Sequence, residues 1–242
     1  MGLYVETVIR TDMARLWDRS QEPDQHQRWD LRFTSITYLP RAGEDEPQRF
    51  RYATRLLPFL SVHGTGISAG ERRRADGTRV SALRFSSRHP LSLLAEGSGY
   101  WRYVPDPDGG PGIRFLTGYD YRPRWGRFGA LADRLVFRPL MGWATAWSFD
   151  RLRLWCERGT TPGRALARAL AESAVRLLAT ATALAYAPLA AALAVGLLAL
   201  LLPPLPGTPA ARRCLRTPPG RVPAPEPRLL ATLSPLNTPE PS

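Results

Sequence analysis

Residues 48–57 read QRFRYATRLL, and the alternation in this stretch is the clearest structural signal of the chain. Phe50, Tyr52, Thr54 and Leu56 fall on one face, and arginines and an alanine fall on the other. Successive side chains of a β-strand point to opposite faces of the sheet. A period of two therefore predicts a strand with one buried and one solvated face.

The flanking sequence extends this strand into an antiparallel sheet. Further strand patterns occur at residues 3–10, 33–39, 60–70, 79–87, 94–104 and 113–121. Asp76-Gly77 predicts a hairpin turn, and residues 106–112 (DPDGGPG) predict a loop. After the first strand, Asp12 is placed to cap a short helix, and a second short helix is predicted up to Trp29.

The pattern changes from strand to helix near residue 126. From 127 to 157 the apolar side chains recur at helical spacing: Leu131, Leu135, Leu140, Trp143, Trp147 and Leu154. Pro139 is expected to kink or restart this helix. A long amphipathic helix laid on the concave face of a curved antiparallel sheet buries both apolar surfaces, so the sequence predicts an α+β fold of this kind.

This order of elements resembles the helix-grip superfamily called SRPBCC, which includes START domains and polyketide cyclases. The resemblance rests on LYVETVIR (3–10), HQRW (26–29) and YDYRPRWG (119–126), and it covers residues 1–157. It implies a cavity between sheet and long helix that holds an apolar or amphipathic small molecule.

Candidate ligand-binding residues are the aromatic and polar groups expected to face this cavity. They are Tyr52, Thr54, His63, Trp101, Tyr103, Phe115, Tyr119, Tyr121, Trp143 and Trp147. For each of them, ordinary core packing is the alternative interpretation. His63 is also considered as a general base for a cyclisation, against a purely structural role. No triad spacing or phosphate-binding fingerprint is present, so we assign no catalytic residue.

Residues 177–202 (LLATATALAYAPLAAALAVGLLALLL) form an uncharged run of 26 residues. As one helix it would be about 39 Å long, enough for a hydrocarbon core of about 30 Å, so we predict a transmembrane helix here. The alternative is an Ala/Leu helix packed on the domain. The N-terminus does not read as a signal peptide, so we expect a single-pass membrane protein with a cytoplasmic N-terminal domain. The predicted organisation is a helix-grip domain (1–157), a basic connecting helix (158–176), the transmembrane helix (177–202) and a Pro-rich disordered tail (203–242).

Composition restricts the remaining function classes. The 33 basic residues, all arginine, exceed the 21 acidic residues, and the formal charge is +12. Because acids are interleaved with the arginines of the N-terminal region, we expect no nucleic-acid partner. With 2 cysteines and 3 histidines we expect no metal and no cofactor. The sequence thus predicts a membrane-tethered binding protein for a hydrophobic small molecule (lipid, isoprenoid or polyketide-like). The alternatives are a cyclase or aromatase-type enzyme using the same cavity, and a non-catalytic interaction module whose cavity has collapsed.

Overall fold

The computed structural model describes residues 2–41, 43, 46–57, 60–106, 110, 112–219 and 227–233. Within them the chain forms a 7-stranded antiparallel sheet in the order β1-β7-β6-β5-β4-β3-β2. The strands are β1 (Leu3–Arg10), β2 (Ser35–Tyr38), β3 (Gln48–Leu57), β4 (Leu60–Arg73), β5 (Arg79–Ser86), β6 (Leu94–Pro105) and β7 (Gly112–Pro123). Each of them falls on a predicted strand, and β1 and β3 begin and end where the sequence predicts. The side chain of Leu56, assigned to the dry face of β3, lies outside the described residues.

Two short helices follow β1, and a long helical segment follows β7. They are α1 (Met13–Gln21), α2 (Pro23–Trp29), α3 (Gly126–Ala132), the π-helical turn η1 (Asp133–Phe137) and α4 (Arg138–Arg158). Asp12 caps α1 as expected, because its carboxylate accepts a hydrogen bond of 2.7 Å from the backbone N–H of Arg15. Pro139 lies in the first turn of α4, where the absence of a backbone N–H breaks no helical hydrogen bond.

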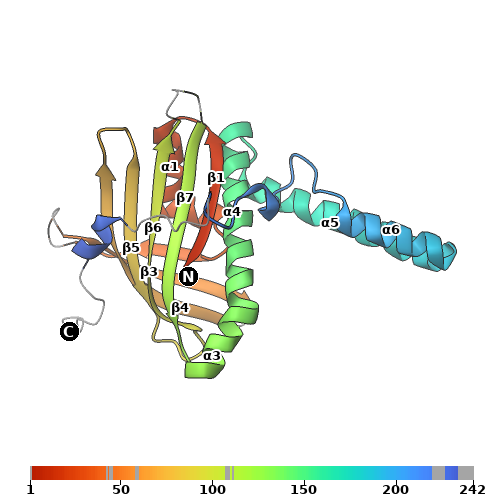
Figure 1. Cartoon of the computed structure of the whole chain (residues 1–242), viewed down its shortest axis with the longest axis horizontal. Coiled ribbons are helices and arrows are strands. Elements are labelled where there is room, and N and C mark those ends of the chain that lie inside the picture. The colour runs from red at the N-terminus through yellow and green to blue at the C-terminus, as the bar shows by residue number, and fades with distance from the viewer. Residues whose placement is uncertain are drawn as a thin grey trace.

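The sheet is strongly bent, and α4 lies against its β1 side (Figure 1). The core between them contains Val5, Trp29, Phe115, Phe149 and Leu152, all fully buried. The rings of Phe115 and Phe149 stack with centroids 4.5 Å apart. Full burial of each such side chain contributes about 1.5–3 kcal/mol, so this contact fixes the helix on the sheet. The predicted helix-grip arrangement is confirmed.

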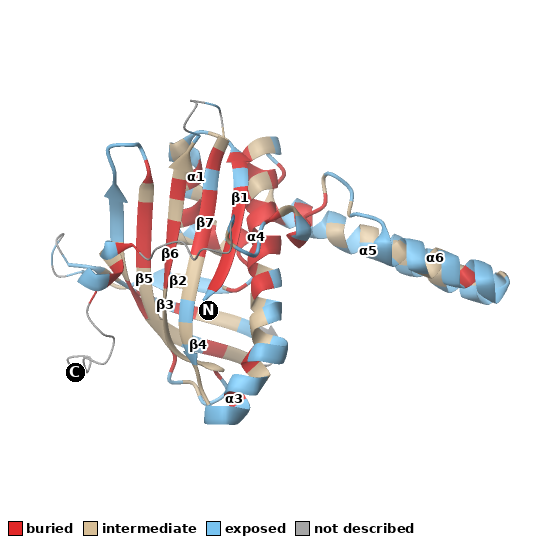
Figure 2. Cartoon of the chain, in the orientation of Figure 1, coloured by how far each residue is buried: buried red, intermediate tan, exposed pale blue. Residues whose placement is uncertain are grey.

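The first half of the long helical segment does not pack as its periodicity predicts. Leu131, Leu135, Leu140 and Trp143 are exposed, and Trp143 keeps 45% of its surface accessible. Figure 2 shows α3 and the adjoining part of α4 mainly as exposed surface, whereas the second half of α4 is buried. The helical segment extends past the part of the sheet that it packs on, so its apolar stripe is longer than the surface available to cover it.

The prediction of a single transmembrane helix over 177–202 is wrong. The run is divided between α5 (Pro162–Tyr186) and α6 (Leu189–Leu201), with Ala187 in an extended conformation and Pro188 before α6. Proline cannot donate the helical hydrogen bond, which explains why α5 ends there. The two helices pack on each other as a hairpin that projects from the α4 side of the molecule as a rod (Figure 1). Among the described residues, no helix combines the length and the apolar character needed to cross a membrane.

The segment after the hairpin returns to the domain, although the sequence predicts a disordered tail. The buried carboxylate of Asp150 on α4 accepts hydrogen bonds from the N–H of Ala210 and from Nη1 of Arg213, each 2.8 Å long. Glu6 of β1 and Leu215 exchange two backbone hydrogen bonds of 2.9 Å. The short 3-10 helix η2 (Ala211–Arg213) forms in this segment.

A second tail segment covers the outer face of the sheet. The 3-10 helix η4 (Arg228–Thr232) places Leu230, together with Leu233, against the outward side chains Tyr100 and Leu116. An apolar face on each side of the sheet therefore requires a cover on each side, and the tail supplies the second cover. Residues 220–226 and 234–242 lie outside the described part of the chain.

Candidate functional site

A cavity of about 120 Å³ lies between the concave face of the sheet and the start of α4. Its apolar wall comes from the sheet, from the segment between α2 and β2, and from the helical segment. The wall includes Phe33, Ile36, Phe50, Leu83, Phe85, Phe137 and Met141. The bent sheet creates this space because α4 contacts the β1 side of the sheet and leaves the β3 and β5 side chains facing a gap.

The volume limits the size of an occupant. An engineered apolar cavity of about 150 Å³ in another protein stays dry and binds benzene. The cavity here is of similar size, so it has room for a single ring or a short alkyl segment. A lipid-sized molecule would require the aromatic side chains of the wall to move.

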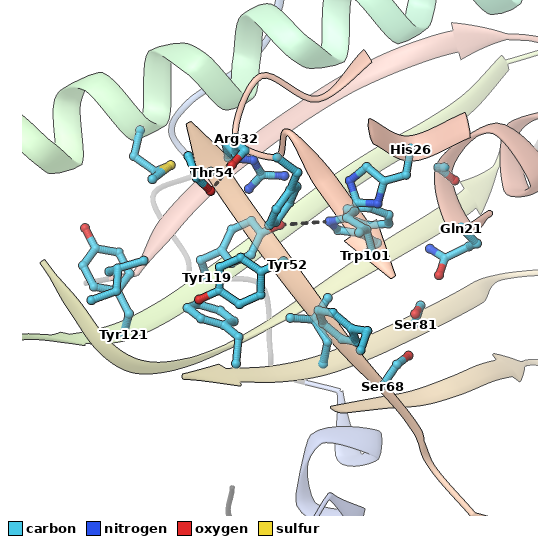
Figure 3. Close-up of a pocket in the computed structure, with 18 of the residues that line it drawn as sticks. Gln21, His26, Arg32, Tyr52, Thr54, Ser68, Ser81, Trp101, Tyr119 and Tyr121 are labelled. Atoms are coloured by element: carbon cyan, nitrogen blue, oxygen red, sulfur yellow. Dashed lines mark hydrogen bonds between the residues drawn. The ribbon is translucent and has the colours of Figure 1, made fainter. Parts of the chain in front are cut away.

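Several predicted site residues line the cavity: Tyr52, Thr54, Trp101, Tyr119 and Tyr121. Figure 3 shows them around one space, contributed by β3, β6 and β7. Their position follows from the strand periodicity, which the sequence reveals directly. That they contact a ligand stays a prediction.

Hydrogen bonds hold most of these polar groups in place. The indole Nε1 of Trp101 donates to the Tyr119 hydroxyl at 3.2 Å (Figure 3). Thr54 Oγ1 donates to the backbone oxygen of Arg32 at 2.5 Å, and the Tyr121 hydroxyl donates to Asp133 at 2.6 Å. The wall is therefore apolar with a few fixed polar groups, which is the usual character of a small-molecule site.

The other predicted site residues lie elsewhere. His63 is exposed on the outer face of β4, because its neighbour Val62 is buried and alternate side chains face opposite ways. The prediction that His63 lines this cavity is therefore wrong, and its role as a general base stays a prediction that the cavity does not support. Tyr103, Phe115 and Trp147 belong to the packed core, and Trp143 is on the exposed side of α4. For Tyr103, Phe115 and Trp147 the alternative interpretation, core packing rather than ligand contact, describes the structure better; Trp143 neither lines the cavity nor belongs to the core.

Sequence reasoning missed the principal polar cluster of the cavity, which consists of His26, Asp30 and Arg32. Asp30 accepts hydrogen bonds from Nε of Arg32 (2.9 Å) and from its Nη2 (2.6 Å). Nε2 of His26 lies 3.0 Å from Oδ2 of Asp30. His26 and Arg32 line the cavity, and the carboxylate lies behind them, fully buried. The available signal was a charged D-x-R pair between the apolar residues Trp29 and Phe33, with His26 one helical turn before Asp30.

The charge states of this cluster follow from burial and mutual contact. Burial alone would raise the pKa of Asp30, but the Arg32 guanidinium and the hydrogen bonds from His26 and Arg32 outweigh it and hold that pKa well below its usual range. Burial lowers the pKa of His26, although Asp30 opposes the shift. His26 is therefore neutral at pH 7, with Nε2–H donating to an ionised Asp30. Burial also raises the pKa of Tyr52 to about 12, so its hydroxyl stays protonated.

The described part of the chain holds neither a metal-binding group nor a reactive cysteine. No group of three or more His, Cys, Asp or Glu side chains there is arranged to hold a metal ion. Cys156 and Cys214 are free and buried, and burial raises the pKa of Cys214 to about 12. The thiolate is the reactive form of cysteine, so a buried and protonated Cys214 is a poor nucleophile.

Comparison with known proteins gives a curated relative and a set of structural neighbours. The uncharacterized membrane protein YndG of Bacillus subtilis (strain 168) is 46% identical over 168 residues, which is 69% of this chain and 62% of that protein. The chain thus spans about 62% of the length of this relative. No family model matches the chain.

The structural neighbours are START and aromatase/cyclase proteins, the group that the sequence resemblance indicates. A STAR-related lipid transfer protein from Xanthomonas axonopodis has a TM-score of 0.45 at 16% identity, and the match covers 61% of this chain and 81% of that one. The Zhui aromatase/cyclase from Streptomyces sp. R1128 has a TM-score of 0.41 at 13% identity, covering 63% and 95%. A START superfamily protein from Mycobacterium smegmatis has a TM-score of 0.41 at 12% identity, covering 62% and 96%.

Proposed function

We propose that this protein binds a hydrophobic small molecule in the cavity between sheet and α4, and that it does so while attached to a membrane. The observation that supports ligand binding is the cavity itself: an apolar space of about 120 Å³ with a small number of fixed polar groups at one wall. Apolar pockets with a few convergent polar groups are the usual form of small-molecule sites. An interaction module with a collapsed cavity is less consistent with this open space.

The polar cluster favours an uncharged ligand. The charge of Arg32 is balanced by Asp30, and His26 is neutral at pH 7. A charged ligand would therefore place an unbalanced charge in an apolar space, which costs free energy. A neutral molecule with an apolar ring or chain and one hydroxyl or carbonyl group fits better, because the Tyr119 hydroxyl and the Arg32 guanidinium can bond that group.

Attachment to a membrane is supported by the apolar hairpin α5–α6 and by the name of the relative, which is called a membrane protein. Hydrophobic ligands concentrate in bilayers, so a domain held at the bilayer surface would meet them at high local concentration. The single-pass arrangement expected from the sequence is not part of this proposal, since the chain breaks the apolar run at Pro188.

The cavity is tested with a small apolar probe and with the protein as isolated. Native mass spectrometry of protein from gentle extraction should show a bound neutral species. Saturating toluene should raise the Tm of the wild-type protein. Ser81 lines the cavity, so Ser81→Leu fills part of it and should reduce toluene affinity at least tenfold. Ser98→Leu, at a half-buried serine outside the cavity, is the control and should bind as wild type does. Absence of both a bound species and a toluene shift would refute ligand binding.

A cyclase-type reaction is the second candidate, and the His26–Asp30 pair is the observation that favours it. With Nε2–H directed at Asp30, Nδ1 of His26 is free of that proton and is a potential base at the cavity wall. Such a reaction would change the bound molecule. Incubation of the extracted ligand with wild-type protein should then give a product of altered mass, for example by loss of water, and His26→Phe should not. An unchanged ligand would leave binding as the function.

A further inference from the structure

The hairpin formed by residues 177–202 has no face that suits water. None of its 26 residues is charged. Large apolar side chains are exposed on both helices, and Tyr186 at the tip is 88% accessible. The exposed set includes Leu177, Leu178, Leu184, Leu193, Leu197 and Leu200. A helix that packs on a globular partner normally keeps a polar face toward solvent, and this hairpin lacks one.

Its two helices cover only a small part of this apolar surface. Ala192 is the buried residue of α6, and Gly196 lies against Thr180 of α5. The contact between the helices therefore uses small residues, and the leucines remain outside it. A second copy of the chain could cover one side of the hairpin but would leave the opposite side in water. A lipid bilayer covers all sides at once.

Charge is confined to the base of the hairpin. The Arg176 guanidinium donates to the backbone oxygens of Ala199 (2.7 Å), Leu202 (2.8 Å) and Pro203 (2.9 Å), and to Glu172. These bonds satisfy carbonyls at the end of α6 that have no helical partner. Three backbone oxygens at this end are thus paired where the uncharged part begins, which lowers the cost of placing it in a bilayer.

Both ends of the hairpin stay at the same place on the domain. Arg158, at the end of α4, donates from Nη1 to the oxygen of Pro206 at 3.2 Å. Four residues later Ala210 is bonded to the buried Asp150. The chain therefore leaves the domain within α5, whose first turns still pack on it at Pro162 and Ala165, and is back on it directly after α6. In Figure 1 the rod accordingly projects from one side of the molecule and its base lies next to α4.

The hairpin is too short to cross a bilayer. α6 has 13 residues and is about 20 Å long at 1.5 Å per residue. The uncharged end of α5, residues 177–186, is about 15 Å long. Both lengths are shorter than the hydrocarbon core of about 30 Å, so the hairpin does not reach the other surface. Exposed arginines on the first turns of α5, Arg164 and Arg168, lie outside the apolar part and would meet lipid headgroups.

We propose that residues 177–202 enter a lipid bilayer from one side as a re-entrant hairpin, with the sheet domain and residues 206–219 on that same side of the membrane. This inference rests on the membrane attachment proposed above, and it replaces a membrane crossing with a one-sided anchor. It does not depend on the ligand of the cavity.

Vesicle flotation tests the attachment. The full-length protein should float with vesicles of phosphatidylcholine and phosphatidylglycerol, and float less with phosphatidylcholine alone. Leu197→Arg should reduce the vesicle-bound fraction at least tenfold. Leu91→Arg is the matched control, because Leu91 is 54% exposed and Leu197 is 57% exposed, and it should float as wild type does. Wild-type protein that stays unbound, or a Leu197→Arg variant that still floats fully, would overturn the anchor.

Labelling from one side of the membrane tests the hairpin. Asp24→Cys on the domain and Thr217→Cys after the hairpin both place a thiol at an exposed position. In membrane preparations of known orientation, a membrane-impermeant maleimide should reach both from the same side. Ala185→Cys near the tip should react only after detergent is added. Labelling of Asp24→Cys and Thr217→Cys from opposite sides would show a crossing and overturn the hairpin, while leaving the attachment intact. The toluene shift of Tm reports separately on the cavity.

Discussion

Replacing Asp30 with Asn should destabilise the protein by about 3 kcal/mol. The Asp30 side chain is fully buried and accepts bonds from the backbone N–H of Arg32 (3.0 Å), from the Arg32 side chain and from His26. Breaking a buried ion pair by removing one partner costs about 3–5 kcal/mol, because the other charge remains buried and uncompensated. Asparagine keeps one oxygen that can still accept from Arg32, so we expect the lower end of that range.

The free energy of unfolding is measured by urea titration, followed by tryptophan fluorescence and circular dichroism at pH 7. Asp12→Asn is the control, since it makes the same chemical change at a side chain that is 57% exposed. Asparagine caps helices about as well as aspartate, and an exposed ion pair contributes about 0–1 kcal/mol, so the control should lose less than 1 kcal/mol. Equal losses in the two variants would refute the conclusion that the Asp30–Arg32 pair is desolvated.

The sign of the pH dependence follows from the same pair. The pKa of Asp30 is depressed in the folded protein, so its contribution to stability is complete above the unfolded pKa of about 3.9 and is lost as pH falls toward the folded value. Asp30→Asn should therefore cost much less stability near pH 2 than at pH 7. An equal cost at both pH values would contradict this assignment.

Three further changes test other parts of the structure. Burial lowers the pKa of His26, so the free energy of unfolding should fall by up to about 1.4 kcal/mol per pH unit below pH about 6.5. Urea titrations at pH 7.5 and 5.5 should therefore show a smaller fall for His26→Phe than for the wild-type protein. Gly66→Ala would place a Cβ 2.2 Å from Cζ of Phe50, so the Phe50 ring must move. Both the Tm and the rise in Tm caused by toluene should therefore change. An unaltered Tm would contradict the close contact between Gly66 and Phe50. Asp150→Asn weakens the bonds to Ala210 and Arg213, so trypsin should cleave after Arg213 at least tenfold faster, and an unchanged rate would show that Asp150 does not hold the tail.

The cavity shows which of its residues can be predicted from the alternation of side chains in the strands. The position of Tyr52 and Thr54 on the inner face follows from alternation within one strand, because the pleat of the backbone alone sets it. His63 shows the corresponding limit: β4 is rich in glycine and its alternation is weak, so its inner face could not be read from the residues alone. His26 and Arg32 enter the cavity from a helix and a loop, for which no periodicity indicates direction.

The long helix and the apolar run show a different limit. A hydrophobic stripe over 127–157 indicates a helix, but not how much of it finds a sheet to pack on, and Trp143 remains half exposed for that reason. Similarly, 26 uncharged residues indicate an apolar segment but not whether it continues straight through Pro188.

Over residues 1–157 the amino-acid sequence was sufficient for the order of strands and helices, because backbone geometry and local side-chain patterns dictate these over a few residues. It was not sufficient for the contacts between distant segments. The Asp30–Arg32–His26 cluster depends on how a loop meets the sheet. The return of the chain from α6 to Asp150 depends on Arg158 and Arg213 finding carbonyl and carboxylate partners many residues away. Such partners are brought together by the three-dimensional packing of the whole chain, which no local pattern of residues encodes.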